Sequence, residues 1–323
     1  MQNAEQAALT MTCKECDTRC QRFGKHRNGL RRFRCPQCKR TYTEAHRLTL
    51  GEMYVSEEKA LLALKLLIEG NSIRSTMRIA GIDGNTITKV LTLAGERCDK
   101  LMGRLLVNVP VTDVQADEIW GFVQKKEAHK APFEANDKTI GDAYCFVAID
   151  RNTKLVLNFA LGRRDQATTD LFIEGLRAAT AAQRFQITTD GFQPYVSAIK
   201  TTLSDRCDFA QLIKVYAAPR EGEQRYSPAD VVEALPRPIM GNPDPAKICT
   251  SHVERQNLTI RMQMRRMTRL TNAFSKKWDN LWSAYCLHFA YHNFCRIHRT
   301  IRVTPAMEAG ITDHVWDLAE LLA

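Results

Sequence analysis

The sequence predicts a multidomain α+β protein in which two small N-terminal modules precede a larger domain built on a mixed sheet flanked by helices. Three observations predict this class. Two Cys-x-x-Cys pairs stand near the N-terminus, short helical segments separated by glycine follow them, and strand-like and helix-like segments alternate after residue 110. We therefore expect three domains, over residues 1–50, 51–106 and 107–323.

The composition favours a polyanionic partner. The 323 residues carry a formal net charge of +10, and basic side chains attract phosphates and release counterions on binding. No apolar run approaches the roughly 20 residues that span a bilayer, and residues 1–10 lack the charged start and apolar centre of a signal peptide. We expect a cytoplasmic, nucleoid-associated protein without membrane contact, whose 11 cysteines are metal ligands or buried thiols.

The two cysteine pairs predict a zinc ribbon over residues 1–50. Cys13 and Cys16 form the first pair, Cys35 and Cys38 the second, and the intervening segment falls in the roughly 15–20-residue range of structural zinc sites. Four thiolates fill the tetrahedral shell of Zn²⁺ and leave no position for a catalytic water. Cys20 is the competing ligand, and its x3 spacing from Cys16 makes it a free thiol in our interpretation.

Basic residues dominate the segment between and after these pairs. Residues 32–34 (Arg-Phe-Arg) and 39–42 (Lys-Arg-Thr-Tyr) place aromatic side chains among basic ones. This pattern suits contact with phosphates and nucleotides, so we expect the ribbon to bind DNA. The alternative is a zinc-stabilised interaction module with a solvated basic face.

A helix-turn-helix is expected over residues 51–106. The predicted helices cover residues 57–69, 73–80 and 85–102. Ser72 suits an N-cap and Gly81 a turn, and two helices joined by a Gly-containing turn are typical of this motif. Thr88 and Lys89 near the start of the third helix would then face the DNA major groove. An ordinary three-helix bundle has the same pattern and remains the alternative.

The third domain begins with strands. The expected strands cover residues 113–123, 142–150, 155–161, 185–189 and 212–216, and the expected helices cover 165–182 and 194–203. Three antiparallel strands followed by a helix-strand-helix-strand unit indicate a mixed sheet. The Pro- and Gly-rich segment near 217–250 is expected to be a loop or lid insertion, and C-terminal helices follow it.

Two carboxylates lie on strands that this layout brings together. Asp117 is embedded in the first strand and Asp190 ends the fourth. An acid in an apolar strand is costly to bury without a partner, and a shared Mg²⁺ or Mn²⁺ is such a partner. Glu118 points to the opposite face of its strand from Asp117, so we do not expect it to be a ligand.

A third carboxylate lies on a helix expected from Ser251 to about Leu270. One face of this helix carries Glu254, Asn257, Arg261 and Arg265. That face offers one carboxylate to a metal and basic groups to phosphate. A solvated polar face is the alternative, because such charge patterns are common in helices.

In combination these motifs resemble the DDE transposases of bacterial insertion sequences, and most of all the group around insertion sequence one (IS1-like). The resemblance rests on Asp-Glu-Ile-Trp at 117–120, Thr-Asp-Gly at 189–191, and the segment 252–257 followed by Arg261, seven residues after Glu254. It implies a ribonuclease H-like catalytic domain with Asp117, Asp190 and Glu254 as the DDE triad. Two Mg²⁺ or Mn²⁺ ions would be bound there.

The resemblance also implies an activity. A two-metal site activates water or a 3′ hydroxyl for cleavage of the element's ends and strand transfer into target DNA. Double-stranded DNA would be the partner, and the protein would be a homo-oligomer on paired ends. Three rival hypotheses are a zinc-ribbon and helix-turn-helix regulator, a ribonuclease H-like nuclease that does not join strands, and an inactive domesticated copy.

Overall fold

The structure is a computed structural model. It describes residues 11–25, 30–44, 53–217 and 231–322. The chain divides into two compact units, Met1–Leu62 and Ala63–Ala323, and this division falls within helix α1 (Glu57–Ile68). Each unit is described by itself. Among the described residues, no helix combines the length and the apolar character needed to cross a membrane.

The first unit contains a small antiparallel sheet. Its strands are β1 (Gln21–Lys25), β2 (Arg31–Arg34) and β3 (Thr41–Thr43), in the order β1-β2-β3. The buried core beside this sheet consists of Phe33 together with Cys13, Cys20 and Cys35. So small an apolar core stabilises a fold poorly without a further cross-link, and a metal bound by cysteines is one such cross-link.

Three helices occupy the region where a helix-turn-helix was expected. They are α1, α2 (Ile73–Ala80) and α3 (Gly84–Leu105). The Ser72 side chain caps α2 by accepting from the Ser75 amide at 3.1 Å, and Gly81 ends this helix with a φ of 63°. Helix α3 begins slightly earlier than predicted, because Asp83 caps it through the Asn85 amide at 2.8 Å.

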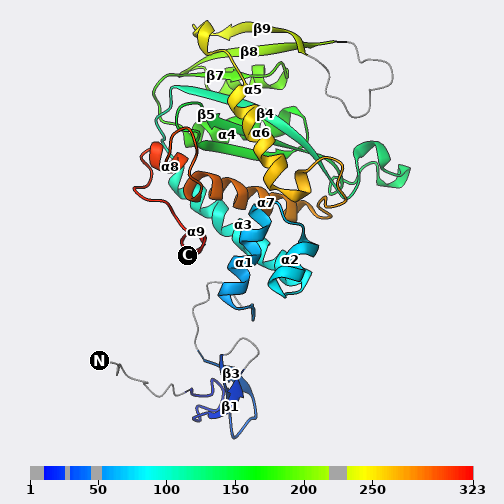
Figure 1. Ribbon diagram of the computed structural model, residues 1–323, viewed down its shortest axis with the longest axis vertical. Helices are drawn as coiled ribbons and strands as arrows, with labels where there is room; N and C mark the ends of the chain where they lie inside the picture. Colours follow the sequence, from blue (N-terminus) through cyan, green and yellow to red (C-terminus); the bar gives the residue numbers. More distant parts are fainter. Residues whose placement is uncertain (1–10, 26–29, 45–52, 218–230, 323) are drawn as a thin grey trace. The chain divides into compact units, whose positions relative to one another are not determined.

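Within the second unit, helix α3 lies along α7 (Trp278–Ala290) (Figure 1). The two helices approach each other closely at Gly95, because a Cβ built there would lie 2.5 Å from the Cα of Ser283. A side chain at residue 95 would therefore push the two helices apart.

A six-stranded mixed sheet forms the centre of the second unit. Its strands are β4 (Asp113–Val123), β5 (Gly141–Asp150), β6 (Val156–Gly162), β7 (Phe185–Thr189), β8 (Cys207–Tyr216) and β9 (Val231–Met240). Their order is β6-β5-β4-β7-β8-β9, with β7 parallel to both β4 and β8 and the other pairs antiparallel (Figure 1). The prediction of an α+β chain with a mixed sheet is confirmed.

Strand β9 corrects the prediction for the segment near 217–250. That segment was expected to be a loop, but β9 pairs antiparallel with β8 along its length. Pro236 and Pro238 hid the strand, and they are tolerated because β9 is the outermost strand of this sheet among the described residues. Residues 218–230 of the same segment lie outside the described residues.

Helices cover both faces of this sheet. They are α4 (Gln166–Ala179) and α5 (Pro194–Thr202) on one face, and α6 (Ser251–Gln263) and α7 on the other. Contacts between aromatic rings identify which helices cover each face of the sheet. Phe146 of β5 lies 5.7 Å from Phe172 of α4 and 6.0 Å from Tyr195 of α5, whereas Phe159 of β6 lies 4.7 Å from Phe289 of α7. In Figure 1, α6 crosses the sheet beside β4.

The C-terminal segment closes the β6 edge of the sheet. Helix α7 continues into a π-helical turn (Tyr291–Cys295), and the short helices α8 (Pro305–Glu308) and α9 (Leu318–Leu321) follow. The fully buried Asn293 side chain accepts from the Val156 amide and donates to the Val156 carbonyl, both at 2.9 Å. It thereby satisfies backbone groups that an edge strand leaves unpaired.

Candidate metal centre and catalytic site

The four predicted zinc ligands lie together in the first unit. The sulfur atoms of four residues all lie within 4.8 Å of one another: Cys13, Cys16, Cys35 and Cys38. Two turns with the same backbone hydrogen bond hold them. Asp17 donates to the Cys13 carbonyl at 3.0 Å and Lys39 to the Cys35 carbonyl at 3.1 Å, and both donors have a positive φ, 49° and 61°. Cys20 is buried in the same core but does not belong to this set.

The chemistry of this cluster fits a soft cation. The Tyr42 hydroxyl lies 3.1 Å from the Cys13 sulfur, and this hydrogen bond lowers the pKa of Cys13 to about 6. Hydrogen bonding with the Cys38 thiol and burial raise the pKa of Cys16 to about 12. Sulfur atoms this close cannot all ionise without a positive partner. Four thiolates at tetrahedral corners are the ligand set of structural Zn²⁺.

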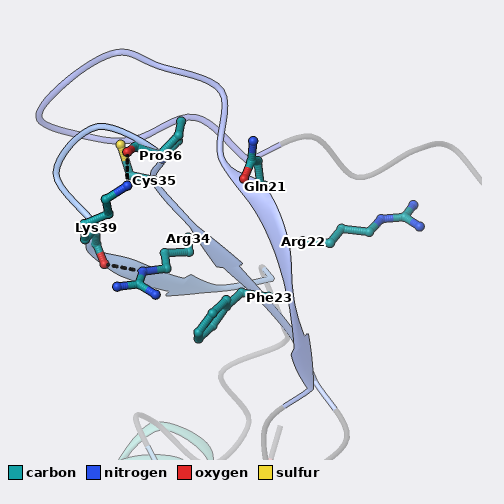
Figure 2. A pocket seen from close by; sticks show the side chains of 7 residues that line it. All are labelled: Gln21, Arg22, Phe23, Arg34, Cys35, Pro36 and Lys39. Carbon is teal, nitrogen blue, oxygen red and sulfur yellow. Dashed lines mark hydrogen bonds between the residues drawn. The ribbon is translucent and has the colours of Figure 1, made fainter.

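A basic pocket lies beside the second cysteine turn, and its lining includes Phe23, Arg34 and Lys39. The guanidinium carbons of Arg32 and Arg34 lie 5.4 and 5.1 Å from the centre of the Phe23 ring. Figure 2 shows Phe23 beneath Arg34, while Arg22 extends away from both. Phe23 is 43% exposed, so this aromatic ring and its neighbouring cations are accessible to a polyanion.

Helix α3 presents one of its two predicted DNA contacts to solvent. Lys89 is exposed, whereas the Thr88 hydroxyl donates to the Gly84 carbonyl at 2.9 Å within the helix. Ile87 and Val90 are buried, as the helical periodicity predicts. The face of α3 that carries Lys89 is therefore the polar one.

In the second unit, strand register brings Asp117 and Asp190 together. Strands β4 and β7 run parallel with Ala116 opposite Thr189, and the next residue along the chain is an aspartate in both cases. One carboxylate oxygen from each of Asp117, Glu118 and Asp190 lies within 4.8 Å of the others. The Phe192 amide donates to Asp190 Oδ1 at 3.0 Å and fixes this carboxylate just past the end of β7.

Glu118 lies close to this pair although it was not expected to be a metal ligand. Its side chain does occupy the opposite face of β4, where Tyr195 donates to it at 3.1 Å and Arg164 at 2.5 Å. It nevertheless reaches the same cluster, because Asp190 lies beyond the end of its strand and is within reach from both faces. Strand alternation therefore identified the correct face, but it does not specify how far the Glu118 side chain reaches.

The crowding of these carboxylates fits a divalent cation. Burial, followed by the negative charges of Asp190 and Glu118, raises the pKa of Asp117 to about 7. Burial also raises the pKa of Asp190. Asn257 of α6 donates to Asp117 Oδ2 at 2.9 Å, and within the described part of the chain its buried Oδ1 has no hydrogen-bond partner. Hard oxygen ligands that repel one another suit Mg²⁺ or Mn²⁺.

Glu254 does not join this cluster in the structure. It lies in the first turn of α6, and its Oε1 accepts from the Lys214 ammonium of β8 and from the Thr250 hydroxyl. Its charge still raises the pKa values of Asp117 and Asp190. Two of the three predicted carboxylates therefore meet, and the third is directed to a lysine.

Helix α6 is shorter than predicted, and this separates the two arginines expected on its face. The helix ends at Gln263, not near residue 270, so the exposed Arg265 begins a 3₁₀ turn (Arg265–Met267) and leaves the face of Glu254. Arg261 donates to the carbonyls of Met267 at 3.1 Å and Trp120 at 3.2 Å. Its guanidinium thus ties α6 to β4 in this structure.

Sequence reasoning missed two basic residues of the site, Arg164 and Lys214. Arg164 follows β6, and its Nη2 lies 3.7 Å from Asp190 Oδ2. Lys214 contacts Glu254 from within β8. The sequence does contain one signal for Lys214. A lysine inside an apolar strand, as in Leu-Ile-Lys-Val at 212–215, is costly to bury without an acidic partner.

Similarity to known proteins was found at the level of a domain. Residues 140–224, which include Asp190, match the family model DDE_Tnp_IS240, a DDE domain. No curated protein matched the chain. The matched model is not that of the group around insertion sequence one, so this narrower assignment remains a prediction.

Three solved structures are similar to the chain at a distance. One is a cryo-EM structure of the piggyBac transposase synaptic complex with hairpin DNA, at 10% identity and a TM-score of 0.36, covering 86% of this chain and 72% of that one. The Mos1 strand transfer complex has 15% identity and a TM-score of 0.21, covering 51% and 60%. A pre-cleavage Mos1 transpososome has 12% identity and a TM-score of 0.20, covering 45% and 57%. Scores this low carry no argument, so the assignment rests on the family match. The chain carries the DDE domain of a DDE-type DNA transposase.

Proposed function

We propose that this protein binds the ends of an insertion element and cleaves and joins DNA strands with Mg²⁺ or Mn²⁺ held by Asp117, Asp190 and Glu254. The register that sets Ala116 opposite Thr189 carries this proposal, since it brings two half-buried aspartates to one point. A ribonuclease H-like catalytic domain over residues 107–323 agrees with the mixed sheet and its two layers of helices.

Different residues of the chain would bind the cations, orient a metal ligand and contact DNA. When bound, the two cations activate water or a 3′ hydroxyl and stabilise the leaving oxygen of the phosphodiester. Asp117 and Asp190 hold them, and Asn257 fixes the orientation of Asp117. Glu254, which pairs with Lys214 in this structure, would be the third ligand. Lys214 is then free to contact a DNA phosphate.

The N-terminal modules would supply DNA recognition. We propose a zinc ribbon over residues 1–50, with Zn²⁺ on its four cysteines, and a helix-turn-helix over 51–106. The exposed Lys89 and Arg265 suit phosphate contact. Thr88 and Arg261 were expected to do the same, but their donors are engaged by protein carbonyls, so their contribution to DNA binding would require rearrangement. Assembly as a homo-oligomer on paired ends belongs to the same proposal.

Cleavage of plasmid DNA that carries both ends of the element tests this function. The full chain with Mg²⁺ or Mn²⁺ is expected to nick and join the ends, and Asp117→Asn, Asp190→Asn and Glu254→Gln each to lose about 100-fold or more in rate. Asp205→Asn is the matched control, since this exposed acid pairs with Arg177 at 2.7 Å, outside the cluster. A wild-type chain that binds the ends but cuts under neither cation favours the DNA-binding regulator instead.

A further inference from the structure

Arg164 is held on three sides next to the proposed metal ligands. Its Nε donates to Glu118 at 2.5 Å, and its guanidinium carbon lies 4.0 Å from the centre of the Phe192 ring. Its Nη2 lies 3.7 Å from Asp190 Oδ2. An arginine side chain carries much rotational freedom, so contacts on three sides fix its direction in advance of any ligand.

Glu118 is the buried anchor of this arrangement. Its side chain is 3% exposed, while that of Arg164 is 41% exposed. The fully buried Tyr195 donates to Glu118 Oε2 at 3.1 Å, and Arg164 occupies Oε1. A buried carboxylate needs a cationic partner and hydrogen bonds to both oxygens, and Glu118 has them. Glu118 is therefore committed to Arg164 rather than to a shared cation.

The outer end of the guanidinium remains available. Arginine has five N–H donors, of which Nε supplies one. Among the described residues, neither Nη atom of Arg164 makes a hydrogen bond. The 3.7 Å between Nη2 and Asp190 Oδ2 is longer than a hydrogen bond. These donors lie beside Asp190, where a phosphodiester held by the cations would present its non-bridging oxygens. The planar fork of a guanidinium matches that geometry.

We propose that Arg164 is a substrate-binding residue that donates to a non-bridging phosphate oxygen of the DNA strand being cut or joined, and that Glu118 is the residue that positions it. This inference rests on the proposed function. It assigns Glu118 to the arginine and not to the metal, although its carboxylate lies within 4.8 Å of those of Asp117 and Asp190.

Three measurements on the full chain separate this role from the alternatives. The variants are Arg164→Ala, Arg164→Lys, Glu118→Gln and the double variant Glu118→Gln/Arg164→Ala. Arg184→Ala is the matched control, because Arg184 is an exposed arginine that pairs with Asp208 at 2.7 Å. Thermal unfolding first checks that each variant is folded.

The first two measurements concern metal binding and cleavage. Calorimetric titration with Mn²⁺ alone is expected to give Arg164→Ala and Glu118→Gln affinities equal to or tighter than wild type. The rate of end cleavage falls about 100-fold in Arg164→Ala and stays low in Arg164→Lys. Glu118→Gln lowers the rate about 10-fold and adds nothing in the Arg164→Ala background, since the two residues act as one unit. A tenfold loss of Mn²⁺ affinity in Glu118→Gln would make Glu118 a ligand and overturn the proposal.

The third measurement does not depend on cleavage, and it keeps the proposal testable if the wild-type chain fails to cut. Binding of a labelled DNA duplex is followed in Ca²⁺ over a range of salt concentrations. Loss of one phosphate contact reduces the slope of log K against log salt by about 0.9 in Arg164→Ala. An unchanged slope, or equal cleavage by Arg164→Ala and Arg184→Ala, contradicts the proposal.

Discussion

The side-chain amide of Asn257 donates to Oδ2 of Asp117 at 2.9 Å and thereby links helix α6 to the middle of strand β4. This bond crosses the second unit from the C-terminal helices to the first strand of the sheet. It orients Asp117 from the helix that also carries Glu254. The geometry of the proposed metal site thus depends on how α6 packs on the sheet.

Replacing Asn257 with alanine is expected to weaken metal binding. A residue that orients a metal ligand typically contributes about 10–100-fold in affinity, so the Mn²⁺ dissociation constant should rise about 10-fold or more. Calorimetric titration measures it. Leu258→Ala is the control, because this neighbouring side chain is 46% exposed and carries no hydrogen-bonding group that could orient a carboxylate. Equal Mn²⁺ affinity for the two variants would show that the bond does not orient the carboxylate.

Removing the Lys214 ammonium is expected to have the opposite effect on metal binding. Lys214 forms an ion pair with Glu254 in this structure, so a cation bound by Glu254 would have to displace it. Lys214→Ala should therefore bind Mn²⁺ several-fold more tightly, while Lys200→Ala, at an exposed lysine of α5, should match wild type. Weaker Mn²⁺ binding by Lys214→Ala would contradict this competition and assign the lysine a supporting role.

The cysteine cluster predicts one Zn²⁺ per chain. Metal analysis of the purified protein should find it, and Cys35→Ser should lose it and leave the first unit open to proteolysis. Cys20→Ser should retain the metal, since Cys20 lies outside the set of four sulfur atoms. Loss of Zn²⁺ by Cys20→Ser and its retention by Cys35→Ser would show that Cys20 is a ligand.

Two buried histidines predict loss of stability in acid. Burial lowers the pKa of His288 to about 3 and that of His292 to about 4, below the unfolded value near 6.5. The unfolded chain then binds more protons, so their contribution is complete above about pH 6.5 and is lost as the pH falls toward 4. Each should cost about 2 kcal/mol at pH 5.

His292→Gln tests this contribution. A glutamine amide can keep the hydrogen bond to the Lys154 carbonyl, which His292 Nε2 makes at 3.0 Å, but it does not titrate. The free energy of unfolding in urea, measured at pH 7 and pH 5, should fall less in the variant than in wild type. The same pH dependence in both proteins would mean that His292 does not contribute.

Local patterns predicted the first four strands of the sheet well, but they found only the second half of β8 and missed the edge strand β9. Strands β4 and β7 have the bounds expected from apolar runs and turn residues, so their register placed Asp117 beside Asp190 as predicted. The contact between Glu254 and Lys214 depends on how α6 meets β8, which no local pattern encodes. The strand alternation at Glu118 specified a face but not the reach of its side chain.

Strand joining by a pre-cleaved element end tests the central claim most directly, because it needs the metal site but no prior cleavage. The wild-type chain with Mn²⁺ is expected to join the end's 3′ hydroxyl to target DNA, as is Asp205→Asn, while Asp117→Asn and Asp190→Asn bind the same DNA without joining it. Joining by either of the latter two variants at the wild-type rate would contradict the assignment of this aspartate pair as the metal site.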